Sequence, residues 1–174
     1  AVPVAFSEAK NTTPHPIIRT IALFIIVSSR SVNSLIWALI LVFICGPGIF
    51  AGTIAIGLRS IGFCAKLLYE AIEEIDHNQV EAIQATGASR AQQMLYAIVP
   101  QVLPTFAGVG VYRWDINIRE STILGLVGAG GIGLQLNGSI NTLAWTQVSM
   151  ILIVILGTVI ISEWISAKVR HAII

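Results

Sequence analysis

Residues 121–162 read STILGLVGAGGIGLQLNGSINTLAWTQVSMILIVILGTVIIS and contain no Asp, Glu, Lys or Arg over 42 positions. Two further uncharged runs precede this stretch, 28 residues at 31–58 and 22 residues at 91–112. A helix needs about 20 apolar residues to cross a bilayer, whereas buried helices of soluble proteins show apolar runs of roughly 10 to 14. The three runs therefore predict a membrane protein.

The composition of the whole chain agrees with a membrane protein. The charged fraction of the 174 residues is 11%, whereas soluble domains carry about 25%. A hydrophobic fraction of 55% and a mean hydropathy of +0.83 exclude intrinsic disorder. The net charge is +1 without any block of Lys or Arg, so no nucleic-acid partner is expected.

Turn formers and charged positions divide the chain into four expected spans, at about 31–45, 49–68, 98–122 and 144–162. The Gly-Pro-Gly sequence at 46–48 cannot sustain a helix, so the chain should reverse there. Residues 17–29 are apolar but too short to span alone, and we expect them to form an interfacial lead-in. The chain opens in an apolar stretch with no basic region, which predicts the tail of a truncated span rather than a signal peptide. The expected fold is an all-α, polytopic transmembrane helical bundle that is N-terminally truncated.

Residues 69–93 form the one long water-compatible segment of the sequence. Asp76 is followed three residues later by Gln79, and Ser89 is followed three residues later by Gln92, and each spacing is that of a capping box. Gly87 lies between the two boxes, where a helix C-terminal glycine is expected. The segment therefore predicts a helix over about 77–86, a corner, and a second helix from about residue 90.

The distribution of basic residues predicts the orientation. Seven of them fall in segments that this span count places on one side of the membrane, and the opposite loops carry none. By the positive-inside rule that side is the cytoplasm, so residues 69–93 and the C-terminus should be cytoplasmic. The seven are Lys10, Arg19, Arg30, Lys66, Arg90, Lys168 and Arg170.

Five charged residues remain at membrane depth, namely Arg59, Arg113, Asp115, Arg119 and Glu120. An isolated Arg at the bilayer centre costs about 3 kcal/mol, so such groups persist only if they face partners or a watery path. Asp115 and Arg119 are four residues apart and can pair on one helix face. Two interpretations stay open: a structural ion-pair network, or arginines that lower the barrier for a translocated anion.

Sequence motifs of catalysis are weak in this chain. Gly128, Gly130 and Gly133 have the spacing of a dinucleotide fingerprint, but no strand precedes them and no acidic residue follows about 20 positions later. We interpret these glycines as an irregular, close-packed stretch at the outer membrane surface. The sequence contains no Gly-Lys pair of a phosphate loop, and its three histidines are scattered. We therefore expect no enzyme activity, no metal and no cofactor in this chain.

The water-compatible segment carries a more specific pattern. Glu81, Ala82, Gly87 and Pro100 follow the order Glu-Ala-Ala, three residues, Gly, nine residues, Ile-x-Leu-Pro. This pattern resembles the membrane subunit of bacterial binding-protein-dependent ABC importers, and apolar residues stand at its three departures, Ile83, Ala97 and Val99. The resemblance implies a segment that couples the permease to an ATPase, with coupling residues Glu81, Ala82, Gly87, Ala88, Ser89 and Pro100.

Five further stretches narrow the resemblance: NTTPHPIIR (11–19), GPG (46–48), LRSIGF (58–63), EAIEEID (70–76) and YRWDINIRESTILGLVGAGGIG (112–133). They resemble the permease of phosphonate importers over nearly the whole chain. The resemblance implies a type I ABC importer permease in the bacterial inner membrane, with a second permease copy forming a homodimer. It also implies two copies of a cytoplasmic ATPase and a periplasmic binding protein that delivers an alkylphosphonate or related phosphorus anion.

Other functional classes predict different observations. A methionine or quaternary-amine importer permease is the nearest alternative, but arginines at membrane depth favour an anion over a quaternary amine. A secondary transporter would use Asp115 and Glu120 for ion coupling and would not need ATP. A membrane-embedded enzyme would need a catalytic constellation, and the sequence shows lone charges instead.

Overall fold

A computed structural model describes residues 1–10, 12, 13 and 15–173 of the chain, so Asn11 and Pro14 of the stretch NTTPHPIIR lie outside the described residues. Every regular element within the described residues is helical, which confirms the predicted all-α class. In chain order the elements are α1 (Val2–Glu8), α2 (Pro16–Ser31), α3 (Ser34–Cys45), α4 (Ile49–Glu73), α5 (His77–Ala85), α6 (Arg90–Gln93), the π-helical turn η1 (Met94–Ile98), α7 (Val99–Leu126), α8 (Ile132–Asn141) and α9 (Trp145–Ile173).

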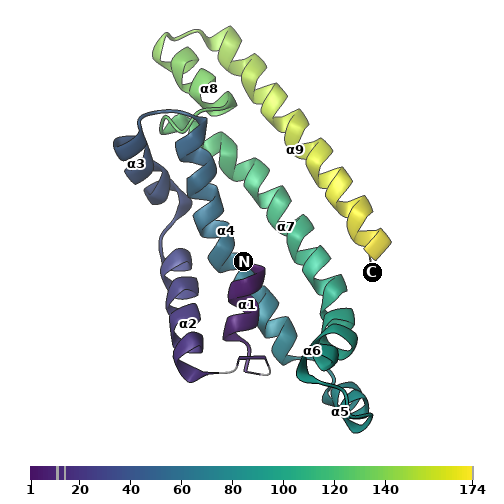
Figure 1. Cartoon of the computed structure of the whole chain (residues 1–174). Helices are drawn as coiled ribbons and strands as arrows, with labels where there is room; N and C mark the ends of the chain where they lie inside the picture. Colours follow the sequence, from purple (N-terminus) through teal and green to yellow (C-terminus); the bar gives the residue numbers. More distant parts are fainter. Residues whose placement is uncertain (11, 14, 174) are drawn as a thin grey trace.

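Three continuous helices among the described residues are long and apolar enough to cross a membrane. They are Ile49–Glu73, Arg90–Leu126 and Trp145–His171, with 25, 37 and 27 residues. At about 1.5 Å per residue, each exceeds the roughly 30 Å hydrocarbon core of a bilayer. Helix α7 packs against both α4 and α9 (Figure 1). The helices at 49–73 and 145–173 extend beyond the predicted spans 49–68 and 144–162.

The region before α4 differs from the predicted span 31–45. Helix α3 begins at Ser34 and has 12 residues, a rise of about 18 Å that is shorter than the hydrocarbon core. Helices α2 and α3 meet at 89°, and only the two together are long and apolar enough to cross a membrane. The break has a local cause, because the Asn33 side chain accepts a hydrogen bond from the Leu35 N–H and so starts a new helix.

Packing of α2 against α4 corrects the predicted position of Arg30. The neighbouring Ser29 hydroxyl donates to the Leu58 carbonyl and accepts from the Gly62 N–H at 3.2 Å, and both partners lie midway along α4. Arg30 therefore lies at the middle of α4 and not at the end of the bundle that carries Lys10. The prediction that all seven basic residues share one side is wrong for Arg30, because α2 packs along α4.

Close backbone contacts join the other end of the bundle. A Cβ added to Gly52 would lie 2.5 Å from the Ala129 carbonyl oxygen, and one added to Gly125 would lie 2.5 Å from the Gly133 Cα. Gly128 and Gly130 have positive φ, 88° and 83°. The prediction of an irregular, close-packed glycine stretch is confirmed.

Two apolar clusters hold the helices together. The larger one lies toward the α5 end and joins α1, α2, α4, η1 and α7 through buried side chains that include Ala5, Ile26, Leu68, Ile72 and Ile98. The smaller one lies toward the α8 end and consists of Ala38, Ala55, Leu124 and Ala129. Charged side chains occupy the level between these two clusters.

Candidate functional site

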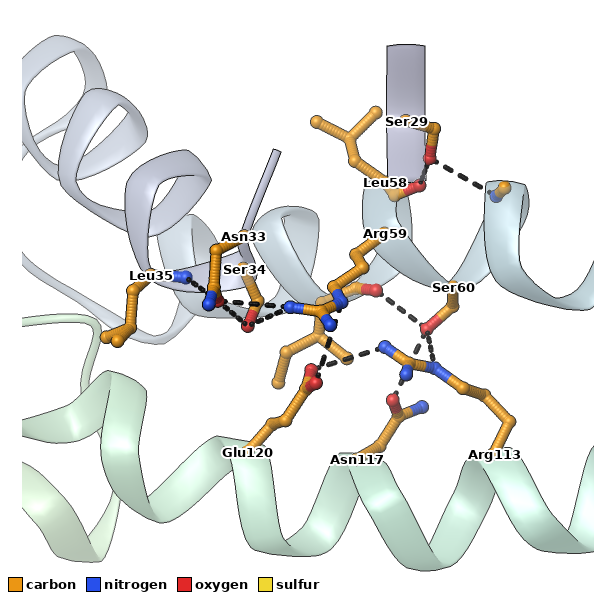
Figure 2. A network of polar contacts seen from close by, with 12 residues as sticks. Ser29, Asn33, Ser34, Leu35, Leu58, Arg59, Ser60, Arg113, Asn117 and Glu120 are labelled. Carbon is orange, nitrogen blue, oxygen red and sulfur yellow. Dashed lines mark hydrogen bonds and ion pairs between the residues drawn. The ribbon is translucent and has the colours of Figure 1, made fainter. Parts of the chain in front are cut away.

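A buried arginine joins α7 to α4 in the middle of the bundle. Arg113 is 4% exposed. Its Nε donates to the Ser60 hydroxyl at 2.8 Å, and its Nη2 donates to Glu120 Oε2 at 3.2 Å (Figure 2). The guanidinium carbon also lies 5.4 Å from the centre of the Phe63 ring. A buried charge is tolerated only with such partners, so this arginine is a satisfied part of the helix interface.

The other side of Glu120 faces a second arginine. Glu120 Oε1 lies 3.8 Å from Arg59 Nε, and Arg59 Nη1 donates to Asn33 Oδ1 at 3.0 Å (Figure 2). Asn33 is also the residue that caps α3. The Glu120 network, defined as Asn33, Arg59, Arg113 and Glu120, thus connects the break between α2 and α3 to both α4 and α7. One carboxylate stands between two guanidinium groups, which leaves one positive charge in surplus.

A second set of charges joins α7 to α9. Asp115 Oδ2 accepts from Arg119 Nη2 at 2.7 Å, which confirms the predicted pair, and Asp115 Oδ1 accepts from the Ser162 hydroxyl at 3.1 Å. Arg119 Nη2 also lies 3.9 Å from Glu163 Oε1. Arg119 keeps 49% of its side chain exposed, in contrast to Arg113. Its guanidinium is available to a solute.

Arg119 faces a cavity of about 490 Å³ between α7 and α9. Asp115, Glu163, Arg170 and His171 line the same cavity, so it holds two arginines, a histidine and two acidic side chains. The hydroxyl of Ser166 also belongs to its wall, and this buried atom has no hydrogen-bond partner among the described residues. A polar cavity beside a membrane-length helix can carry water and small polar solutes.

The structure therefore divides the five residues predicted at membrane depth into two groups. Arg59, Arg113 and Glu120 meet on the side of α4, whereas Asp115 and Arg119 meet on the side of α9. Residues two apart on a helix point about 200° apart, which explains why 113 and 115 face different neighbours. Sequence reasoning missed Asn33, Ser60, Asn117 and Ser162, which are polar residues in apolar spans and supply hydrogen-bond partners there.

The predicted coupling segment lies at one end of the bundle, where α5 and α6 extend beyond α4 and α7 (Figure 1). Neither α5 nor α6 contains a buried residue. The box at Ser89 is confirmed, since Ser89 Oγ accepts from the Gln92 N–H at 3.4 Å and Gln92 Oε1 accepts from the Ser89 N–H at 2.8 Å. Local capping therefore stabilises the start of α6 in this exposed segment.

The predicted box at Asp76 is only half formed. The Asp76 carboxylate caps α5 by accepting from the Asn78 N–H at 2.9 Å. The Asp76 N–H, however, donates to Gln101 Oε1 at 2.9 Å and not to Gln79. Gln101 lies in the first turn of α7, so a long-range contact replaces the predicted local one and attaches the segment to the bundle.

The corner between the two short helices requires glycine because of its backbone. Gly87 has φ +82°, and no heavy atom lies within 4 Å of an added Cβ. Helix α5 ends at Ala85, one residue before the predicted end. Of the other predicted coupling residues, Glu81, Ala82, Ser89 and Pro100 are exposed and Ala88 is half-buried.

Comparison with known proteins identifies similar chains. Residues 1–171 match the family described as binding-protein-dependent transport system inner membrane component. The phosphite transport system permease protein PtxC of Stutzerimonas stutzeri is 44% identical over 167 residues, 96% of this chain and 61% of that protein. The phosphate-import permease protein PhnE of Mycolicibacterium smegmatis is 38% identical over 174 residues, 100% of this chain and 33% of that protein. The chain thus spans less than two thirds of the length of these relatives.

Solved structures show the same fold. The methionine ABC transporter MetNI in an inward-facing conformation has a TM-score of 0.79 at 20% identity, covering 99% of this chain and 85% of that chain. An amino acid ABC transporter solved with histidines also has a TM-score of 0.79, at 18% identity, covering 98% of this chain and 82% of that chain. The predicted type I importer permease fold is confirmed.

Proposed function

This chain belongs to the family of inner membrane components of binding-protein-dependent transport systems, and from that premise we propose that it moves phosphonate or a related phosphorus oxyanion across the bacterial inner membrane. Two relatives over nearly its whole length are named as phosphite and phosphate transport proteins. The observation that carries the proposal is the arrangement of three arginines between the spans: Arg59 and Arg113 share the one carboxylate of Glu120, and Arg119 lies beside Asp115 and Glu163. The positive charge left over beside Glu120 is suited to an anion.

Within these charges, Arg119 is the residue placed to meet the anion. Its side chain is half exposed to the cavity between α7 and α9, and Asp115 neutralises part of its charge. An anion loses hydration energy inside the membrane, and a nearby guanidinium offsets part of that loss. Partial neutralisation keeps binding weak enough for release, which a conducting path requires.

Arg59, Arg113 and Glu120 have a different part in the proposed pathway. Their partners are other protein side chains, and Arg113 is shielded from solvent. They hold α4 and α7 at a fixed separation and contribute a positive field at mid-depth. Substitution of Arg113 should therefore reduce transport by disturbing the packing of α4 against α7. Substitution of Arg119 should reduce transport by weakening the contact with the anion.

The α5–α6 segment is proposed to couple transport to ATP hydrolysis by two copies of a separate ATPase. It is exposed, carries Glu81 on the first helix, and connects α4 to α7, the two helices that the Glu120 network joins. Closure of the ATPases would move these helices and open the path to the periplasm. The proposed assembly also contains a second permease copy and a periplasmic binding protein, with residues 69–93 and the C-terminus in the cytoplasm.

Uptake by the complete importer in proteoliposomes tests the pathway. With labelled methylphosphonate and saturating binding protein, Arg119→Gln should lower the uptake rate about tenfold, because one charge-assisted contact in a low-dielectric site is lost. Lys66→Gln is the matched control, since Lys66 also pairs with an acid four residues away but lies outside both charged groups. Equal rates for Arg119→Gln and wild type, with equal expression, would remove Arg119 from the pathway.

Crosslinking tests the coupling assignment and the orientation together. A Glu81→Cys variant should crosslink to the ATPase subunit, and a Gly131→Cys variant at the opposite end of the bundle should not. Crosslinking at residue 131 alone would show that the orientation is inverted. ATP-independent uptake by the same vesicles would instead favour a secondary transporter.

A further inference from the structure

A second polar cavity lies at the α5 end of the bundle, away from the charges between the spans. It has a volume of about 450 Å³ and is bounded by the loop after α1, the end of α4, α5, α6 and η1. Lys10, His77 and Arg90 line it, and none of the lining residues is acidic. The cavity therefore carries two full positive charges and a histidine.

These basic side chains lack protein partners. Elsewhere in the described chain, Arg19, Arg59, Lys66, Arg113 and Arg119 each lie within 4.0 Å of a carboxylate oxygen. By contrast, the side chains of Lys10, His77 and Arg90 make no hydrogen bond or ion pair with any residue that the structure describes. Three separate elements thus bring uncompensated donors to one cavity.

Two acidic side chains near these basic residues, Glu73 and Asp76, are already engaged and do not line the cavity. Glu73 Oε1 accepts from the backbone N–H of Lys10 at 3.0 Å. Asp76 Oδ1 accepts from both the backbone N–H and the side-chain amide of Asn78, each at 2.9 Å. The Glu73 contact joins the end of α4 to the residue two positions after α1, and the Asp76 contacts cap α5; neither carboxylate forms an ion pair with a basic side chain of the cavity in the described part of the chain.

The number of converging donors indicates the chemistry of the anion. Arg90 offers paired N–H groups, Lys10 an ammonium and His77 a ring N–H, so the site suits an anion with three or more oxygens. A carboxylate has two oxygens in one plane, whereas a phosphate group has four in a tetrahedron, two of them esterified in a phospholipid diester, and can contact side chains that approach from three directions. Ile75, Val80 and Ile98 also line the cavity, so part of its wall is apolar.

We propose that this cavity binds a phosphate group, supplied either by inorganic phosphate or by the headgroup of an anionic phospholipid. The site is distinct from the translocation pathway and does not depend on the identity of the transported anion. Lys10 belongs to the loop after α1, whereas His77 and Arg90 begin the two helices of the coupling segment. A bound phosphate group therefore ties the coupling segment to the body of the bundle.

Two binding measurements on the full-length permease, without ATPase, separate the two sources. In nanodiscs of phosphatidylcholine, binding of radiolabelled inorganic phosphate is titrated. In phosphate-free buffer, the permease is placed in nanodiscs of mixed phosphatidylglycerol and phosphatidylcholine and is then released from them in the mass spectrometer. The number of phosphatidylglycerol molecules that stay bound to the permease is counted. Each arm compares wild type, the double variant Lys10→Gln with Arg90→Gln, and the Arg30→Gln control. Arg30 is also exposed and forms no ion pair with the residues that the structure describes.

In at least one arm, the double variant should bind about tenfold more weakly or worse, because two charge-assisted contacts are removed. Arg30→Gln should change binding less than about twofold. In the same arm Arg90→Lys should bind more weakly than wild type and more tightly than the double variant, because Lys keeps the charge and loses the paired N–H groups. Lys10 and Arg90 are exposed, so helicity and the melting temperature should remain as in wild type.

Equal binding by wild type and the double variant in both arms would overturn the proposal. The uptake experiment with Arg119→Gln is independent of this result, so failure of this site and failure of the proposed pathway are distinguishable.

Discussion

The Glu120 network and the α5–α6 segment are built on opposite principles. In the network, two contacts join residues far apart in sequence, Arg59 with Asn33 and Arg59 with Glu120, and a third joins Arg113 to Glu120 within α7. In the segment, most side-chain contacts join near neighbours, such as Ser89 with Gln92 and Asp76 with Asn78. Tertiary packing therefore determines the first region, whereas the second is determined largely by its own few residues.

The energetic consequences of the two designs differ. A buried charge that loses its partner retains its full desolvation penalty, so the network should respond strongly to single substitutions. The helices of the coupling segment contain no buried residues, and each cap contributes about 1 kcal/mol. Substitutions there should affect coupling more than global stability.

The largest effect is expected from Glu120→Gln. This change leaves Arg59 and Arg113 facing each other without a counter-charge, and we expect a loss of about 3 kcal/mol in unfolding free energy. Thermal unfolding in detergent, followed by tryptophan fluorescence, measures the loss. Glu70→Gln is the control, because it breaks an exposed helical pair with Lys66 and should cost less than about 0.5 kcal/mol. Similar melting temperatures for both variants would show that the network is not a stabilising unit.

Gly125→Ala tests long-range packing without a change of charge. The added methyl group would collide with the backbone of Gly133, and overpacking of this kind costs about 1–3 kcal/mol. Gly108→Ala on the same helix has open space around the new Cβ and should gain up to about 1 kcal/mol in helix propensity. The melting temperatures of the two variants should shift in opposite directions. A shift of the same sign in both would mean that the backbone around Gly125 accommodates the added methyl group at little energetic cost.

Gly87→Leu tests the locally determined corner. A residue with a Cβ pays about 1–2 kcal/mol in the left-handed region that Gly87 occupies, so the corner should change shape while the protein remains inserted. Binding-protein-stimulated ATPase activity and uptake should become uncoupled in the assembled importer. Gly87→Asn should keep coupling, because Asn tolerates this conformation. Normal coupling in the Leu variant would show that the corner geometry is dispensable.

The smallest effect is expected from Ser89→Ala. Loss of the cap removes about 1 kcal/mol from the start of α6 only. Hydrogen exchange at residues 90–93 should become about fivefold faster, with little change in the melting temperature. Gln84→Ala, on an exposed position of α5, serves as the comparison and should leave exchange at these residues unchanged. Faster exchange throughout α7 in Ser89→Ala would mean that the segment is less autonomous than its local contacts indicate.

Several features could be predicted from the sequence because their causes are local. Uncharged runs longer than a bilayer crossing determine helices, since a chain in lipid must satisfy its own backbone hydrogen bonds. The capping box at Ser89 and the positive φ at Gly87 also depend on a few neighbouring residues. The pair of Asp115 and Arg119 follows from helical spacing alone.

Other features were decided by tertiary structure. Hydropathy could not show that Arg30 lies beside the middle of α4. The positions of charged residues along the sequence predicted five charges at membrane depth. Their division between the α4 side and the α9 side depends on the rotation of α7 against both neighbours. The Asp76 N–H donates to Gln101 and not to Gln79, and this choice of partner also depends on a contact between distant parts of the chain. Periodicity and capping act over three or four residues, whereas depth, rotation and partner choice arise from contacts between helices that are distant in the chain.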